Sequence, residues 1–227
     1  MGCWTGFVRP APYAPLFGNL RGMRKGIIAI MKPENEAKGM RAQILTTAKS
    51  LFIQQGYHGL AMQRISDALG VTKAALYYHF KDKEELFLAV LTDYLDEMET
   101  ALDQIMAKPA TCREKIKDFM EYVLVQPAEQ RAIIRLASQE MGQLSAPARK
   151  TFERIYRKKF IGKVEAILTS GMERGEFKRI RPEVATWTLL GMMYPYFYPT
   201  NAGSSGLTDE TIQQILSVFL DGVACSQ

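Results

Sequence analysis

Apolar side chains recur at the three- and four-residue spacing of an α-helix from about Glu36 to the C-terminus, and no segment shows the alternation of a β-strand. In the first run, Met40, Ile44, Ala48 and Phe52 fall on one helical face. The chain also contains no internal repeat. The sequence therefore predicts an all-α fold of about nine helices.

Turn and cap residues divide this pattern into separate helices. Gly56 ends the first helix, and Gly70 separates two short helices over residues 61–69 and 73–78. Asp82, with a glutamate three residues later, begins a long fourth helix. Further helices are expected over residues 112–125, 128–141, about 147–172, 182 to about 197, and from 209 onward.

The two short helices and the turn between them have the arrangement of a helix-turn-helix, in which the second helix enters the major groove of DNA. In that helix the small side chain of Ala74 lets the backbone approach base edges, and Lys73 is placed to reach guanine or a phosphate. Leu76 and Phe80 should pack inward. The candidate DNA-contacting residues are Gln63, Arg64, Thr72, Lys73, Ala74, Tyr77, Tyr78, His79 and Lys83.

Several of these candidates also have a purely structural interpretation. Tyr77 and Tyr78 carry hydroxyl groups suited to phosphate oxygens, but the alternative is that they are packing residues. The alternative for His79 is a hydrogen-bonded structural histidine. For Gln63 and Arg64 it is a solvated helix surface.

The string GVTKAALYYHFKDKEELF, which begins at Gly70, resembles the DNA-binding domain of the TetR family of bacterial transcriptional regulators. The motif is far more specific than a generic helix-turn-helix, and the resemblance covers about residues 38–87. It departs from the family at Leu60 and Ala61, where many members have the Ser or Thr that caps the second helix. Either His58 or backbone amides then serve there, or the phosphate contact made by that Ser or Thr is absent.

This resemblance implies a ligand-responsive regulator, most simply a repressor, that binds a near-palindromic operator in double-stranded DNA as a homodimer. It further implies that a hydrophobic small molecule releases the DNA and that the last two helices pair two copies of the chain. The implied interface residues are Trp187, Leu190, Met193, Ile212, Ile215 and Phe219. The alternative is a DNA-organising protein of the same fold that binds no small ligand.

The second half of the chain is rich in methionine and aromatic residues, which favour an apolar binding pocket, although an ordinary core is the alternative. The candidate pocket residues are Met98, Phe119, Tyr122, Met141, Tyr156, Phe160, Trp187 and Tyr194. Residues 149–163 carry seven basic side chains and one acidic side chain. They form either a solvated face or a cationic rim, in which Arg154 or Arg157 would contact the head group of an acyl or acyl-coenzyme A ligand.

Positive charge is concentrated near the N-terminus. Residues 1–31 carry four basic side chains and no acidic one, residues 32–87 have a net charge of +2, and residues 88–227 have a net charge of −1. This distribution favours contact between the first part and a polyanion, unless it is a chance surplus of surface lysines. The expected segments are a basic arm without fixed structure (or a start assigned too early) over 1–35, a DNA-binding domain over 36–85, and a ligand-binding and dimerisation domain over 86–227.

The remaining composition excludes other classes of protein. Three scattered cysteines argue against a disulfide framework or a zinc site and fit a reducing cytoplasm, which the family resemblance implies is bacterial. With two histidines and no glycine-rich phosphate loop, HExxH motif or nucleophile elbow, we expect no enzyme, no cofactor and no metal. No apolar run approaches the ~18 residues of a membrane span, and the basic N-terminus lacks a signal-peptide core, so no membrane partner is expected.

Overall fold

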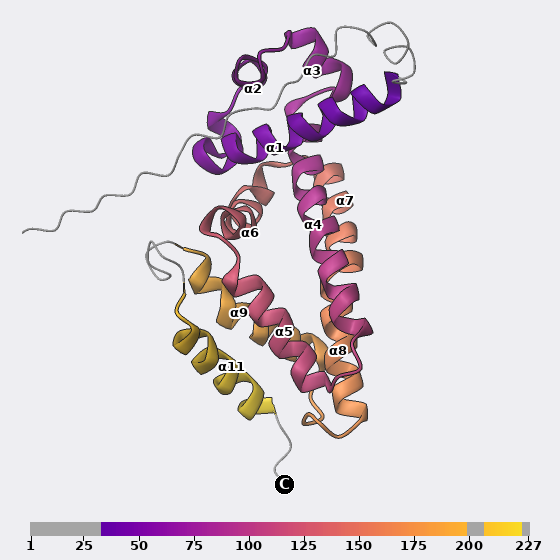
Figure 1. The fold of residues 1–227 in the computed structure, drawn as a ribbon, viewed down its shortest axis with the longest axis vertical. Coiled ribbons are helices and arrows are strands. Elements are labelled where there is room, and N and C mark those ends of the chain that lie inside the picture. The colour runs from indigo at the N-terminus through magenta and orange to yellow at the C-terminus, as the bar shows by residue number, and fades with distance from the viewer. Residues whose placement is uncertain (1–32, 199–206, 224–227) are drawn as a thin grey trace, which may run out of the picture. The chain divides into compact units, whose positions relative to one another are not determined.

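The chain is helical, as its periodicity predicted. The computed structural model describes residues 33–198 and 207–223 (Figure 1). The predicted arm over residues 1–35 lies almost entirely outside these ranges. No helix within them is both long enough and apolar enough to cross a membrane.

The bounds of most helices differ from the predicted ones by only a few residues, and those of α5 are identical. The α-helices are α1 (Pro33–Gly59), α2 (Met62–Leu69), α3 (Lys73–His79), α4 (Lys83–Ala107), α5 (Cys112–Val125), α6 (Ala128–Glu140), α7 (Ala146–Tyr156), α8 (Gly162–Glu173), α9 (Pro182–Met193) and α11 (Asp209–Val223). Three shorter segments continue them: the 3-10 turns η1 (Met141–Gln143) and η3 (Tyr194–Phe197), and the π-turn η2 (Arg157–Ile161).

Turn chemistry sets the geometry of α2 and α3. Gly70 ends α2 with a φ of +66°, a left-handed conformation that favours glycine. The Thr72 hydroxyl then accepts a hydrogen bond from the backbone N–H of Ala75 at 3.2 Å and caps α3, as predicted. Leu76 and Phe80 are fully buried, which confirms that this face of α3 packs inward.

Caps also fix the ends of α4 and α5. The Asp82 carboxylate accepts a hydrogen bond from the N–H of Glu85 at 2.7 Å, while the Glu85 carboxylate accepts one from the N–H of Lys81 at 3.0 Å. Helix α5 begins with a full capping box between Thr111 and Glu114. The acidic cap predicted at Asp82 is therefore present. The Glu85 carboxylate accepts from the N–H of Lys81 and not from that of Asp82, as it would in a regular capping box.

The single helix predicted over residues 147–172 is continuous, but in its middle it widens into the π-turn η2 between α7 and α8. Five apolar residues of this segment lie at a four-residue spacing: Phe152, Tyr156, Phe160, Val164 and Leu168. At 3.6 residues per turn, each four-residue step overshoots a full turn by about 40°, so a long α-helix would rotate this stripe away from the core. The wider π-turn offsets that rotation, and Phe160, Val164 and Leu168 are all buried.

Residues 82–198 and 207–223 pack around α4 and α5. Helix α4 packs against α5, α7 and η2, and Figure 1 shows it running beside α7. Helix α8 packs against α5 and α9, and α11 packs against the same two helices. The buried apolar residues form one continuous core, which extends from Ile44 in α1 to Leu220 in α11.

The last turns of α8 depend on a close approach that only glycine permits. A Cβ atom added to Gly171 would lie 2.3 and 2.4 Å from two ring carbons of Phe177 and 3.0 Å from the Cβ of Cys112. Both neighbours are buried, so neither ring nor helix has space to move aside. The chain that leaves α8 is therefore anchored by Phe177 lying directly on Gly171.

We expect Gly171→Ala to lower the free energy of unfolding by about 1–3 kcal/mol, because the added methyl group overpacks the core. Urea unfolding at a fixed protein concentration measures the effect. Gly191→Ala is the matched control, since nothing lies within 4 Å of the methyl group it would add inside α9. It should be neutral or stabilising through helix propensity. Equal stabilities of the two variants would contradict this account of Gly171.

Candidate functional site

The outer face of α3 is exposed and carries polar and aromatic side chains. Lys73, Ala74, Tyr77 and Tyr78 are all exposed, and Tyr78 is 82% accessible. The Lys73 Nζ atom lies 5.8 Å from the ring centroid of Tyr77, so the charge and the ring form one surface. His79 is half-buried, with its ring edge-on to Tyr78 at 5.1 Å. A tyrosine this exposed has no packing role, and its hydroxyl is available to a partner.

Helix α2 presents its candidates differently. The Gln63 amide nitrogen donates to the Asp67 carboxylate at 2.7 Å and to the Ser66 hydroxyl at 3.4 Å, so it is tied to its own helix. The Arg64 side chain, in contrast, is exposed. Helix α2 starts at Ala61 without a side-chain cap, since His58 bonds to Gln143 instead (Nε2 to Oε1, 2.7 Å).

Lys83 is engaged inside the protein rather than free for DNA. Its Nζ donates to the backbone oxygens of Tyr57 at 2.7 Å and Leu60 at 3.0 Å, and it lies 4.5 Å from the ring centroid of Tyr57. The lysine therefore satisfies carbonyl groups at the end of α1. Its assignment as a DNA contact does not fit this position.

Arg41 is a basic residue near α3 that the sequence reasoning did not single out. It is exposed, and its guanidinium carbon lies 5.1 Å from the ring centroid of Phe80, at the C-terminal end of α3. It lies on α1, far along the chain from the helix-turn-helix motif, so nothing local in the sequence identifies it.

Polar contacts attach the helix-turn-helix to the corner between α6 and α7. The Glu84 carboxylate accepts hydrogen bonds from the backbone N–H of Ser145 at 2.6 Å and from its hydroxyl at 2.8 Å. The Glu140 carboxylate accepts from the N–H of Tyr57 at 3.3 Å. With the His58–Gln143 bond, these contacts hold the end of α1 and the start of α4 against that corner.

A cavity of about 640 Å³ lies among the helices that follow the helix-turn-helix. Of the eight pocket residues predicted from the sequence, seven line it: Met98, Phe119, Met141, Tyr156, Phe160, Trp187 and Tyr194. The eighth, Tyr122, does not. The sequence reasoning missed most of the remaining wall, which is formed by Leu91, Tyr94, Leu95, Val123, Ile133, Ile134, Ala137, Ser138, Phe152, Glu153, Arg157, Ile161, Leu190, Gly191, Met193 and Phe197.

Few polar groups face this cavity. The Ser138 hydroxyl donates to the backbone oxygen of Ile134 at 3.0 Å, and the Tyr194 and Tyr198 hydroxyls share a hydrogen bond of 3.1 Å. Burial raises the pKa of Tyr156 to about 12, so this phenol stays neutral. The lining is otherwise apolar, which suits a hydrophobic ligand of limited polarity.

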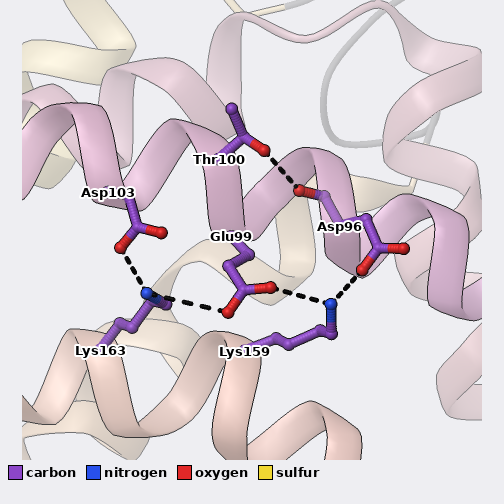
Figure 2. Close-up of polar contacts among 6 residues, drawn as sticks. All are labelled: Asp96, Glu99, Thr100, Asp103, Lys159 and Lys163. Atoms are coloured by element: carbon purple, nitrogen blue, oxygen red, sulfur yellow. Dashed lines mark hydrogen bonds and ion pairs between the residues drawn. The ribbon is translucent and has the colours of Figure 1, made fainter.

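Two lysines of the basic segment are bound to acids of α4 rather than free for a ligand (Figure 2). Lys159 pairs with Asp96 and with Glu99 at 2.8 Å, and Lys163 pairs with Asp103 and with Glu99 at 3.8 Å. Hydrogen bonds to Asp96 and then Glu99 raise the pKa of Lys159. This ion-pair ladder joins α4 to η2 and α8 along one edge.

The two arginines proposed for a ligand head group lie in different places. Arg157 lines the cavity, and its guanidinium lies 3.5 Å from the Glu165 carboxylate. Arg154 is exposed and is not part of the lining. The only acid in the lining is Glu153.

Four of the six predicted dimer residues are buried within the single chain. Met193, Ile212, Ile215 and Phe219 belong to its core. Trp187 is 55% exposed, and Leu190 is half-buried. The exposed apolar side chains on these two helices are instead Val184 and Trp187 on α9 and Val218 on α11. The family resemblance implied these four residues as an interface between two copies, whereas they pack inside one chain, where α9 contacts α8 and α11 contacts α5 and α9.

The described residues contain no group of three or more His, Cys, Asp or Glu side chains placed to hold a metal ion, and Cys112 is a buried free thiol.

Comparison with known proteins links both parts of the chain to one family. Residues 44–90 match the family described as bacterial regulatory proteins, tetR family, and residues 109–196 match the tetracyclin repressor-like C-terminal domain. The transcriptional activator FasR of Mycolicibacterium smegmatis is 35% identical over 107 residues, which is 47% of this chain and 44% of that protein. The transcriptional repressor KstR2 of Rhodococcus jostii is 25% identical over 187 residues, or 82% and 92% of the two chains.

A solved structure extends the likeness to the fold. The TetR family transcriptional regulator PfmR from Thermus thermophilus matches with a TM-score of 0.66 and 26% identity, and the match covers 81% of this chain and 99% of that one. The helix-turn-helix, the helical second part and these matches agree with one another. This chain belongs to the TetR family of transcriptional regulators.

Proposed function

We propose that this regulator binds a near-palindromic operator as a homodimer and releases it when a hydrophobic molecule occupies the cavity, so that it acts as a repressor. Residues 36–85 would bind DNA, and residues 86–227 would bind the ligand and dimerise. The family is one of transcriptional regulators, not of enzymes. Relatives include both an activator and a repressor, so repression rather than activation is part of what we propose.

The observation that carries the proposal is that α4 belongs to both parts. Its first turn is tied to the helix-turn-helix through Lys83 and to the α6–α7 corner through Glu84. Two turns later the same helix lines the cavity with Leu91, Tyr94 and Met98. A ligand that moves this part of α4 also moves the base of the reading helix.

A small movement at that base has a large effect in a dimer. Two reading helices must enter successive major grooves about 34–36 Å apart on one face of the duplex. A ligand that binds more tightly to a conformation with a different separation lowers the affinity for the operator. The size of this effect is limited by the difference between the ligand's binding free energies for the two conformations. The cavity therefore supports a ligand-responsive regulator over a DNA-organising protein without a ligand.

The ligand class proposed here is an acyl chain or an acyl-coenzyme A. The wall is almost wholly apolar, and Arg157 is the one basic residue in it. A head group at Arg157 would compete with Glu165 for the guanidinium. Lys159 and Lys163 are already neutralised by the ladder and would not contribute.

The exposed apolar side chains of α9 and α11 support a dimer interface. Val184, Trp187 and Val218 are each at least half exposed, although they lie on helices whose other faces are buried. Large exposed apolar side chains gathered on neighbouring helices are typical of an interaction surface. Two copies would pair these faces about a two-fold axis.

For DNA binding, we expect Lys73→Ala to weaken operator affinity by about 1–3 kcal/mol if Lys73 reads a base. Tyr78→Phe, which removes one hydroxyl, should weaken it less. Fluorescence anisotropy on an operator duplex selected from random sequence, at one salt concentration, measures both. Lys150→Ala is the matched control, because it removes an exposed lysine outside the helix-turn-helix. If Lys73→Ala and Tyr78→Phe both leave the operator affinity unchanged, α3 is not the helix that contacts the operator.

For the ligand, a thermal-shift screen of acyl chains, acyl thioesters and hydrophobic drugs should give a stabilising compound that also lowers operator affinity. A ligand at 100 times its Kd stabilises the native state by about 2.7 kcal/mol. Ala137→Trp would place an indole in the cavity wall and should keep DNA binding while losing both effects. If the active compound still released Ala137→Trp from DNA, the effector site would lie elsewhere.

For the dimer, Val218→Glu should shift the protein toward monomer in sedimentation velocity, because it places a charge in an apolar interface. Val125→Glu makes the same change at an equally exposed valine on α5, 65% against 67% accessible. The control should leave the oligomeric state unchanged. An unaltered sedimentation coefficient for Val218→Glu would rule out this face.

A further inference from the structure

The cavity reaches solvent along α7 and η2. Glu153 and Arg157 both line it and are both exposed, whereas Phe152 and Phe160 of the same wall are buried. The Arg157 side chain is 62% accessible. A ligand whose apolar chain fills the cavity can therefore extend out of it beside Glu153 and Arg157. Whatever group it carries there meets the outer surface of α7.

Two further basic residues lie on that outer surface. Arg154 and Lys158 are exposed, and neither lines the cavity. Residues three and four positions apart are neighbours on a helix surface, so Arg154 lies beside both Arg157 and Lys158. These three side chains form a basic cluster next to the opening of the cavity.

The basic cluster is short of acidic partners. Unlike the lysines of the ion-pair ladder, neither Arg154 nor Lys158 makes an ion pair with an acid in the part of the chain that the structure describes. Arg157 pairs with Glu165 at 3.5 Å, and Glu153 pairs with none of the three. Two of the three positive charges are therefore left without an acid, and such a surface attracts anions.

A carboxylate at the end of the apolar chain does not suit this arrangement. It would stop at the opening, between the Glu153 carboxylate and an Arg157 guanidinium that already has an acidic partner. The unpaired cations lie outside the wall of the cavity, so an anion reaches them only on a spacer that passes the opening. A phosphate gains most there, because it carries more charge than a carboxylate and because arginine matches its geometry.

We propose that the basic cluster binds a phosphate group that the ligand carries outside the cavity, on a spacer joined to the apolar chain inside it. This inference rests on the proposed function of the cavity as the effector site, and it narrows the ligand to a phosphate-bearing acyl compound rather than a free acid. Two sources have this chemistry: an acyl thioester of coenzyme A and a lysophospholipid such as lysophosphatidate.

The test compares decanoyl probes by isothermal titration calorimetry on the full chain at low salt. Decanoyl-coenzyme A and 1-decanoyl-lysophosphatidate carry phosphate, whereas S-decanoyl-N-acetylcysteamine and decanoate do not. At least one phosphate-bearing probe should bind about tenfold more tightly than the two others. Added salt should reduce this advantage, because it screens exposed charges. The tighter of the two phosphate-bearing probes identifies the source.

The double variant Arg154→Ala/Lys158→Ala should bind the better phosphate-bearing probe about tenfold less tightly and bind the N-acetylcysteamine thioester as before. A change in the shape of the cavity would weaken both, so unchanged binding of the thioester separates the two causes. Arg174→Ala/Arg179→Ala is the matched control, because it removes the same charge from two exposed residues outside the lining. It should keep the wild-type preference.

The possible failures are distinguishable. If no probe binds, the cavity is not an effector site for acyl ligands, and the proposed function falls together with this inference. If decanoate or the N-acetylcysteamine thioester binds as tightly as both phosphate-bearing probes, the inference is refuted and the proposed function stands. Equal losses of affinity in the two double variants would trace the effect to net charge and would also refute the role of the basic cluster.

Discussion

The structure depends on one helix serving two environments. Helix α4 begins at a cap beside the helix-turn-helix, where Lys83 and Glu84 bond to α1 and to the α6–α7 corner. Its middle turns line an apolar cavity, and its other edge carries the acids of the ion-pair ladder. Because a helix is stiff over such a length, a displacement at any of these contacts is felt at the others.

The π-turn η2 and the ion-pair ladder lie at the same place along the packing of α7 and α8 against α4. The four-residue spacing of Phe152, Tyr156, Phe160, Val164 and Leu168 would drift around a regular α-helix, and the wider turn at Phe160 offsets that drift. The ion pairs that Lys159 and Lys163 make with Asp96, Glu99 and Asp103 lie at and just after this wider turn (Figure 2). Wide turns of this kind recur at functional sites. Here, η2 contributes Arg157 and Phe160 to the cavity wall.

How far the sequence predicts this protein depends on the range of the interactions involved. The cap at Thr72 and the turn at Gly70 are local, so the helix-turn-helix could be predicted from adjacent residues. Much of the cavity wall could also be found, since methionine and aromatic residues mark it. The internal role of Lys83 and the exposure of Val218 depend on how distant segments of the chain pack together. Helical periodicity identifies a buried face, but it does not say whether the same chain or a second copy covers that face.

Trp187 belongs both to the cavity wall and to the exposed apolar surface of α9. If α9 pairs with a second copy as proposed, a ligand that alters the conformation of this side chain would alter the paired surface, and pairing would in turn alter the cavity. By linkage, the apparent affinity for a ligand would then vary with the total concentration of the protein itself. A cell that changed the abundance of such a regulator would retune its sensitivity to the ligand without changing a residue.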